Sequence, residues 1–105
     1  MKLTALQLTI LRGMVDDYED IEQLYLYANR TIVERGQLQV PTTSSQIRFP
    51  LRELMDEVAN LLREGYIEPK YSNDEKLAPL HPVNLKVLHH YWFGPTDKGK
   101  ASVEH

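Results

Sequence analysis

The residues of this chain best suited to chemistry are its histidines, and all four lie in the second half, at His81, His89, His90 and His105. Imidazole binds metal ions and transfers protons near neutral pH. His89 and His90 are neighbours in an apolar and aromatic run that predicts a strand, so their side chains should point to opposite faces. They cannot then bind one metal, and the chain has no cysteine to supply thiolate ligands. We expect neither a metal site nor a cofactor.

Other catalytic patterns are missing from the sequence as well. Ser44 and Ser45 have no nearby histidine, no glycine-flanked serine elbow or phosphate-binding glycine loop occurs, and the glycines lie at turns or element ends. Five acidic residues crowd positions 16–22, before and within the start of a predicted helix, where the helix dipole favours negative charge. The sequence therefore predicts a binding protein rather than an enzyme.

The 105 residues are enough for one modest core, and we expect a single domain over residues 1–105. Apolar residues make up 42% and charged residues 26%, which is typical of a folded globular chain. No secretory leader and no apolar run long enough for a membrane span is visible. We therefore expect a cytoplasmic protein that does not interact with membranes.

Apolar periodicity predicts three main helices. The first covers Leu3–Val15, and the second covers Tyr18–Arg35 and ends before Gly36. Residues 36–46 are rich in turn-forming and hydroxyl side chains, which favour a short strand and a turn. The most regular stripe follows and predicts a third helix over Pro50–Glu64, with proline in its first turn.

A hairpin should follow the third helix. Residues 66–71 alternate as a short strand, and residues 87–93 form an apolar and aromatic run that reads as its partner, ended by Gly94-Pro95. Two of the three aromatic residues at 91–93 should face the core. Thr96 is then the expected N-cap of a last helical turn.

Two short sequence patterns carry a resemblance to a known family. Leu61-Leu62-Arg63-Glu64-Gly65-Tyr66-Ile67-Glu68 resembles the end of the recognition helix and the start of the wing in winged helix-turn-helix regulators of the PadR and MarR kind. Thr96-Asp97-Lys98-Gly99, after the second predicted strand, looks like the exit from the wing in the same families. The resemblance implies an α+β winged helix-turn-helix fold, with three main helices followed by a two-stranded β-hairpin wing.

The resemblance also implies double-stranded DNA as the partner and transcription regulation as the function. The helix from Pro50 would then lie in the major groove with its first residues nearest the bases. The candidate DNA contacts are one group of polar and basic residues from this helix and the wing: Arg48, Arg52, Asn60, Lys70, Lys76 and Lys86. A homodimer is expected, with Leu26 and Val33 forming an additional apolar strip on the second helix as its interface.

The charge of the chain favours a different partner. Its net charge is -3, and the outward face of the third helix carries two basic and four acidic residues, which would repel phosphates. The alternative is a winged-helix module that binds protein and not DNA. A basic patch assembled in space from Arg30, Arg35, Arg48 and Arg52 would favour DNA, and an acidic or apolar groove would favour a protein.

Overall fold

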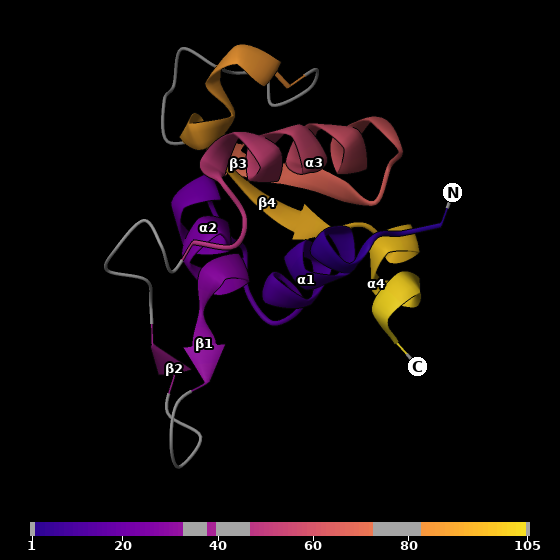
Figure 1. The fold of residues 1–105 in the computed structure, drawn as a ribbon. Helices are drawn as coiled ribbons and strands as arrows, with labels where there is room; N and C mark the ends of the chain where they lie inside the picture. The colour runs from indigo at the N-terminus through magenta and orange to yellow at the C-terminus, as the bar shows by residue number, and fades with distance from the viewer. Residues whose placement is uncertain (1, 33–37, 40–46, 73–82, 105) are drawn as a thin grey trace.

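The computed structural model describes residues 2–32, 38–39, 47–72 and 83–104. Helices and short strands follow one another along the chain (Figure 1). The elements are α1 (Ala5–Gly13), α2 (Ile21–Asn29), β1 (Thr31–Ile32), β2 (Leu38–Gln39), α3 (Leu51–Arg63), β3 (Ile67–Ser72), the 3-10 helix η4 (Leu85–His90), β4 (Tyr91–Pro95) and α4 (Asp97–Val103). The chain is thus an α+β protein with helices and an antiparallel hairpin, as the sequence predicts.

The hairpin of β3 and β4 forms the central sheet. Ile67 pairs with Pro95 and Tyr71 with Trp92, and the register shifts between Pro69 and Tyr71. Glu19, between α1 and α2, adds an antiparallel bridge on the other edge of β4. Its backbone N–H donates to the carbonyl of Phe93 at 3.0 Å, and the N–H of Phe93 donates back at 2.8 Å. The loop between the first two helices is therefore part of the sheet.

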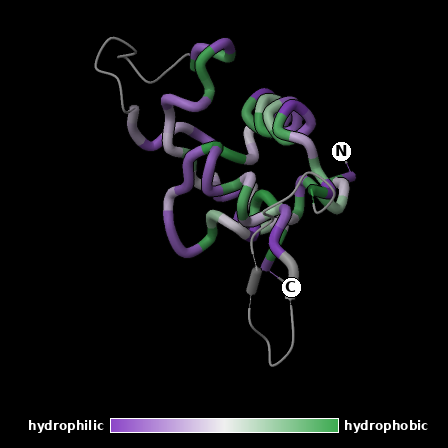
Figure 2. Tube along the Cα trace, turned by 60° about the vertical axis from the view of Figure 1, so that its left-hand side comes forward, coloured by the Kyte–Doolittle hydropathy of each residue, from purple (hydrophilic) through white to green (hydrophobic). Residues whose placement is uncertain are grey.

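The core lies where the apolar stripes of α1, α2 and α3 meet the inner face of this sheet. Hydrophobic and hydrophilic residues alternate along the chain, as helices with one buried face require (Figure 2). Tyr91 and Phe93 are almost fully buried, while Trp92 between them is only partly buried, which confirms that two of these three aromatic residues fill the core. The largest fully buried aliphatic side chains are Ile10, Leu11, Met14, Leu24, Leu54, Val58 and Leu61.

Local capping interactions fix the helix ends. Thr4 and Gln7 form a capping box at the start of α1, with Thr4 Oγ1 accepting the Gln7 N–H at 3.2 Å and Gln7 Oε1 accepting the Thr4 N–H at 2.9 Å. Thr96 caps α4, as predicted, by accepting the N–H of Gly99. Gly65, after α3, has a φ of 77°, a conformation that glycine adopts most readily.

The predicted second helix is wrong at both ends, and most clearly at its C-terminus. The helix ends at Asn29 and not at Arg35, because Arg30 turns to an extended conformation and Thr31–Ile32 pairs with Leu38–Gln39. The expected strip of Leu26 and Val33 required one continuous helix. Leu26 is partly buried on α2, and Val33 lies outside the described residues.

The second strand of the hairpin also begins later than predicted. Residues 87–90 belong to η4, which is kinked at Val87, and β4 starts at Tyr91. β3 ends at Ser72, whose partner is Tyr91, so β3 offers residues 87–90 no pairing position. Gly94 and Pro95, expected to end the strand, are instead its last paired residues.

Candidate functional site

A groove lies between α3 and the 3-10 helix η4, which is drawn in orange above one end of α3 in Figure 1. Its volume is about 610 Å³. The lining residues come from both elements: Leu51, Arg52, Met55, Asp56, Ala59, Arg63, Leu85 and Leu88. A second hollow shares Arg63 and Leu85 with it and continues toward β3, where it reaches Ile67 and Pro69. We call the two together the α3–η4 groove.

The floor of the α3–η4 groove is apolar. Leu51 is 46% exposed and Leu85 is 39% exposed, whereas Leu54, on the inner face of α3, is fully buried. Large aliphatic side chains that stay this exposed on two facing elements indicate a contact surface more strongly than single exposed residues do. The amphipathic pattern of α3 explains why one face of the helix is buried, but it does not explain why Leu51 is exposed.

The position of η4 is fixed by a buried side chain, Leu88, and by the hydrogen bonds of Asn84. Leu88 is buried in the core at 2% exposure. Asn84 caps the first turn, with its Oδ1 accepting the Lys86 N–H at 3.1 Å, and its own N–H donates to the Tyr91 hydroxyl at 3.1 Å. The wall of the groove is therefore tied to the core and to the sheet.

Charged side chains border the apolar floor. Arg52, Asp56 and Arg63 line the groove, and Lys86 is exposed beside Leu85 on η4. Arg63 donates to Asn60 Oδ1 at 3.1 Å. The border nearest the apolar floor thus has more basic than acidic groups, although the whole outward face of α3 is acidic.

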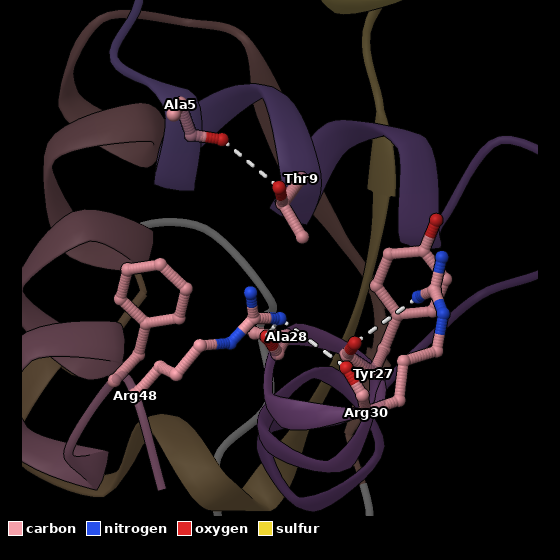
Figure 3. A pocket seen from close by; sticks show the side chains of 7 residues that line it. Ala5, Thr9, Tyr27, Ala28, Arg30 and Arg48 are labelled. Carbon is pink, nitrogen blue, oxygen red and sulfur yellow. Dashed lines mark hydrogen bonds between the residues drawn. The ribbon is translucent and has the colours of Figure 1, made fainter. Parts of the chain in front are cut away.

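Arg48 lies elsewhere, in a pocket formed by α1, the C-terminal end of α2 and the segment before α3 (Figure 3). Its Nη2 donates to the carbonyls of Arg30 at 3.2 Å and Ala28 at 3.4 Å. Arg30 lies over the Tyr27 ring at 3.4 Å and donates to the Tyr27 carbonyl at 3.0 Å. The two guanidinium groups therefore donate hydrogen bonds to backbone carbonyls at the C-terminal end of α2, where the helix dipole favours positive charge.

The predicted DNA contacts are thus divided among separate surfaces. Arg48 lines the pocket of Figure 3, and Arg52 lines the α3–η4 groove. Asn60 donates to Glu57 Oε1 at 3.1 Å and accepts from Arg63. The last three are lysines: Lys70 is on β3, Lys86 is on η4, and Lys76 lies outside the described residues.

Lys70 belongs to a group of aromatic residues that the sequence analysis does not identify. Its ammonium forms an ion pair and hydrogen bond with Glu68, which raises the pKa of Lys70, and it lies 5.6 Å from the Tyr18 ring centre. Tyr18 meets Tyr71 edge-on at 6.2 Å, and Tyr71 stacks on Trp92 at 5.6 Å. The alternation of residues 91–93 could have indicated that Trp92 faces outward, but its partners come from other segments.

The structure also bears on the expected absence of a metal site. His89 and His90 lie in η4 and not in a strand, and their ring centres are 4.2 Å apart at an angle of 82°, so the predicted opposite orientation is wrong. Within the described ranges, no group of three or more histidine, aspartate or glutamate side chains is arranged to hold a metal ion. No helix in the same ranges is long and apolar enough to cross a membrane.

Comparisons with protein families, with curated proteins and with solved structures gave no match to this chain.

Proposed function

We propose that this chain is a protein-interaction module of the winged-helix type, and that the α3–η4 groove binds a segment of a partner protein. The observation that carries the proposal is the apolar floor of this groove, with Leu51 and Leu85 both more than one third exposed on facing elements. The order of α1, α2 and α3 followed by the hairpin of β3 and β4 supports the winged-helix part. Residues 30–50, which separate α2 from α3, make a much longer connection than the turn of a simple helix-turn-helix motif.

Three features make DNA the weaker candidate for the same face. A recognition helix must present its outward side to the bases, but η4 borders that side of α3. Glu53, Glu57 and Glu64, three of the four acidic residues on the outward face, do not line the groove, and they oppose the phosphates of a duplex that covers the whole face. Arg48, which precedes α3 by three residues, already donates hydrogen bonds to backbone carbonyls of Ala28 and Arg30 at the end of α2.

The chemistry of the groove indicates the kind of partner. Leu51, Met55 and Leu85 offer apolar contact, and Arg52, Arg63 and Lys86 outnumber Asp56 along the border. An amphipathic helix with an apolar stripe and flanking carboxylates would satisfy both, because its stripe would fill the floor while its acids meet the guanidinium groups. We therefore assign an acidic amphipathic helix of another protein as the occupant.

The test uses a synthetic helical peptide of about sixteen residues, with leucines at helical spacing and glutamates beside them. The amide spectrum of the labelled chain should change in α3 and η4 when the peptide is added. Leu51→Glu/Leu85→Glu should abolish the change, and a second peptide with lysines in place of the glutamates should bind more weakly. Tyr71→Ala is the matched control, because it removes an exposed apolar side chain outside the groove.

Two results would count against this proposal. No spectral change in α3 or η4 at about 1 mM peptide would exclude an affinity of biological interest for this class of ligand. Sedimentation that shows a dimer dissociated by Leu51→Glu/Leu85→Glu would identify a second copy of the chain as the occupant instead.

Double-stranded DNA remains a second candidate because of one observation. Arg30 and Arg48 line the same pocket, close to the start of α3, which is part of the basic patch that the DNA hypothesis requires. Fluorescence anisotropy with a mixed-sequence duplex at low and high salt tests it. Salt-sensitive binding that Arg30→Glu weakens would favour DNA, whereas no binding at low salt would leave the protein-interaction module.

A further inference from the structure

Three aromatic side chains form a continuous strip away from the α3–η4 groove. Tyr71 and Trp92 are cross-strand partners on β3 and β4, and their rings stack at an angle of 21°. Tyr18, from the loop before α2, meets Tyr71 at 69°. Because Tyr91 and Phe93 point into the core, Trp92 lies on the opposite face of β4. We call Tyr18, Tyr71 and Trp92 the aromatic strip.

The aromatic strip leaves much of its area open. Tyr18 is 44% exposed and Tyr71 is 45% exposed, and Val15, near Tyr18 in the chain, is 42% exposed. These are three of the most exposed large apolar side chains among the described residues. A hollow beside Tyr18 continues the surface and is lined by Val15, Lys70 and Pro95, among others. Exposed aromatic and aliphatic area of this extent on a paired hairpin and the adjoining loop is typical of a binding surface.

The charges around the strip favour a cationic ligand. Asp16 and Asp17 line the hollow, and Asp20 is the N-cap of α2. Burial raises the pKa of Glu19, and the negative charges of Asp17 and Asp20 raise it further. Lys70 is neutralised by Glu68, and Lys100 also lines the hollow. A nucleic-acid strand would meet more carboxylates than free ammonium groups.

We propose that the aromatic strip and the adjoining hollow bind an extended, proline-containing segment of a protein that carries arginine or lysine beside its prolines. Proline rings pack on aromatic faces, and a polyproline II segment loses little conformational entropy when it docks because it is already extended. Its basic side chain reaches Asp16 and Asp17, where it also gains a contact with the Tyr18 ring. This site is independent of the α3–η4 groove.

The experiment follows the fluorescence of Trp92, the only tryptophan of the chain, during titration with synthetic peptides. The probe is an end-capped peptide of about ten residues with two Pro-x-x-Pro repeats and an arginine at each end. Three further ligands share its length: the same prolines with glutamate at the ends, the same arginines with alanine in place of proline, and oligothymidylate. The first peptide should bind at least about tenfold more tightly than each of the others.

Variants link the signal to the strip. Tyr71→Ala and Tyr18→Ala should each weaken binding about tenfold, and Asp16→Asn/Asp17→Asn should reduce the advantage of arginine over glutamate peptides to about twofold or less. Leu51→Ala, in the other surface, should bind as the unmodified chain does. The amide spectrum of core residues such as Leu54 reports whether each variant is folded.

Three outcomes would overturn this inference. One is no fluorescence or amide change at about 1 mM of the arginine peptide. Another is tighter binding of oligothymidylate than of any peptide, which would assign the strip to single-stranded nucleic acid through base stacking. The third is unaltered affinity in folded Tyr71→Ala.

Discussion

The side-chain amide of Asn29 and the backbone of Phe49 hold each other by two hydrogen bonds, although the residues are 20 positions apart. Asn29 Oδ1 accepts the Phe49 N–H at 2.9 Å, and Asn29 Nδ2 donates to the Phe49 carbonyl at 3.0 Å. The same oxygen accepts the Arg48 N–H at 2.9 Å, and the same nitrogen donates to the Tyr25 carbonyl at 3.0 Å. One buried amide thus joins the end of α2 to the approach to α3.

The first prediction concerns this amide. Asn29→Ala removes a fully buried amide and deprives the backbone N–H groups of Arg48 and Phe49 of their acceptor, so the free energy of unfolding should fall by about 3 kcal/mol. Urea denaturation followed by circular dichroism measures it. Gln23→Ala, at an exposed position of α2, should change stability by less than about 0.5 kcal/mol. Equal stability of the two variants would show that the amide is not needed.

A second prediction compares two glycines. A Cβ at Gly99 would lie 2.1 Å from the Tyr66 carbonyl oxygen, so Gly99→Ala must displace backbone and should cost about 2 kcal/mol or more. At Gly65 no atom comes within 4 Å of the added Cβ, and only the φ of 77° opposes the substitution. Gly65→Ala should therefore cost only about 1 kcal/mol. Thermal unfolding of both variants measures the two losses. A smaller decrease in melting temperature for Gly99→Ala than for Gly65→Ala would contradict this packing of α4 against Tyr66.

A third prediction uses the pH dependence of stability. The pKa of Glu19 is raised, chiefly by burial and then by Asp17 and Asp20, above its ordinary value of 4.5. The folded chain therefore binds this proton more tightly than the unfolded chain, and the resulting stability is present below pH 4.5 and lost as pH rises through the folded-state pKa. Glu19→Gln should raise the melting temperature at pH 7 and have no effect near pH 4.

Glu22→Gln provides the control for the third prediction. Glu22 lies in the first turn of α2, where negative charge is favourable, so its neutralisation should lower the melting temperature slightly at pH 7. The two variants should therefore shift the melting temperature in opposite directions. A decrease for both would mean that Glu19 contributes through a favourable charge interaction.

A fourth prediction separates stability from binding on α3. Leu54→Ala empties a fully buried site and should cost about 3 kcal/mol, whereas Leu51→Ala, at a 46% exposed site, should cost less than about 1 kcal/mol. Chemical denaturation of both variants checks this difference. If Leu51→Ala were as destabilising as Leu54→Ala, Leu51 would belong to the core. It would then not be an exposed apolar side chain of the α3–η4 groove.

The sequence predicts the elements whose signals are local. The stripe over Pro50–Glu64 corresponds to Leu51–Arg63, and the predicted cap at Thr96 is confirmed. The predicted end of the second helix was wrong because its apolar residues keep a helical spacing as far as Ile32, past the last helical residue, Asn29. Its β-branched Thr31 and Ile32 fit a strand equally well, and only pairing with β2 decides between them.

The two proposed binding surfaces were harder to predict because they depend on tertiary pairing. Arg48 and Arg52 are four residues apart, yet they line different hollows, since Arg48 precedes α3 and bends back to α2. The α3–η4 groove requires a 3-10 helix where the composition predicts a strand. The aromatic strip joins Tyr18 to residues 71 and 92, a combination that no sequence spacing reveals.

The link between Asn29 and Phe49 has a further consequence for how this chain tolerates change. It holds Asn29 and Phe49 against each other, so the chain leaves α2 and approaches α3 at one place. Loops tied at their base accept insertions at a small entropic cost. An insertion between Asn29 and Phe49 should therefore leave the packing of the three helices unchanged, provided that Arg30 and its contacts with Tyr27 and Arg48 are kept.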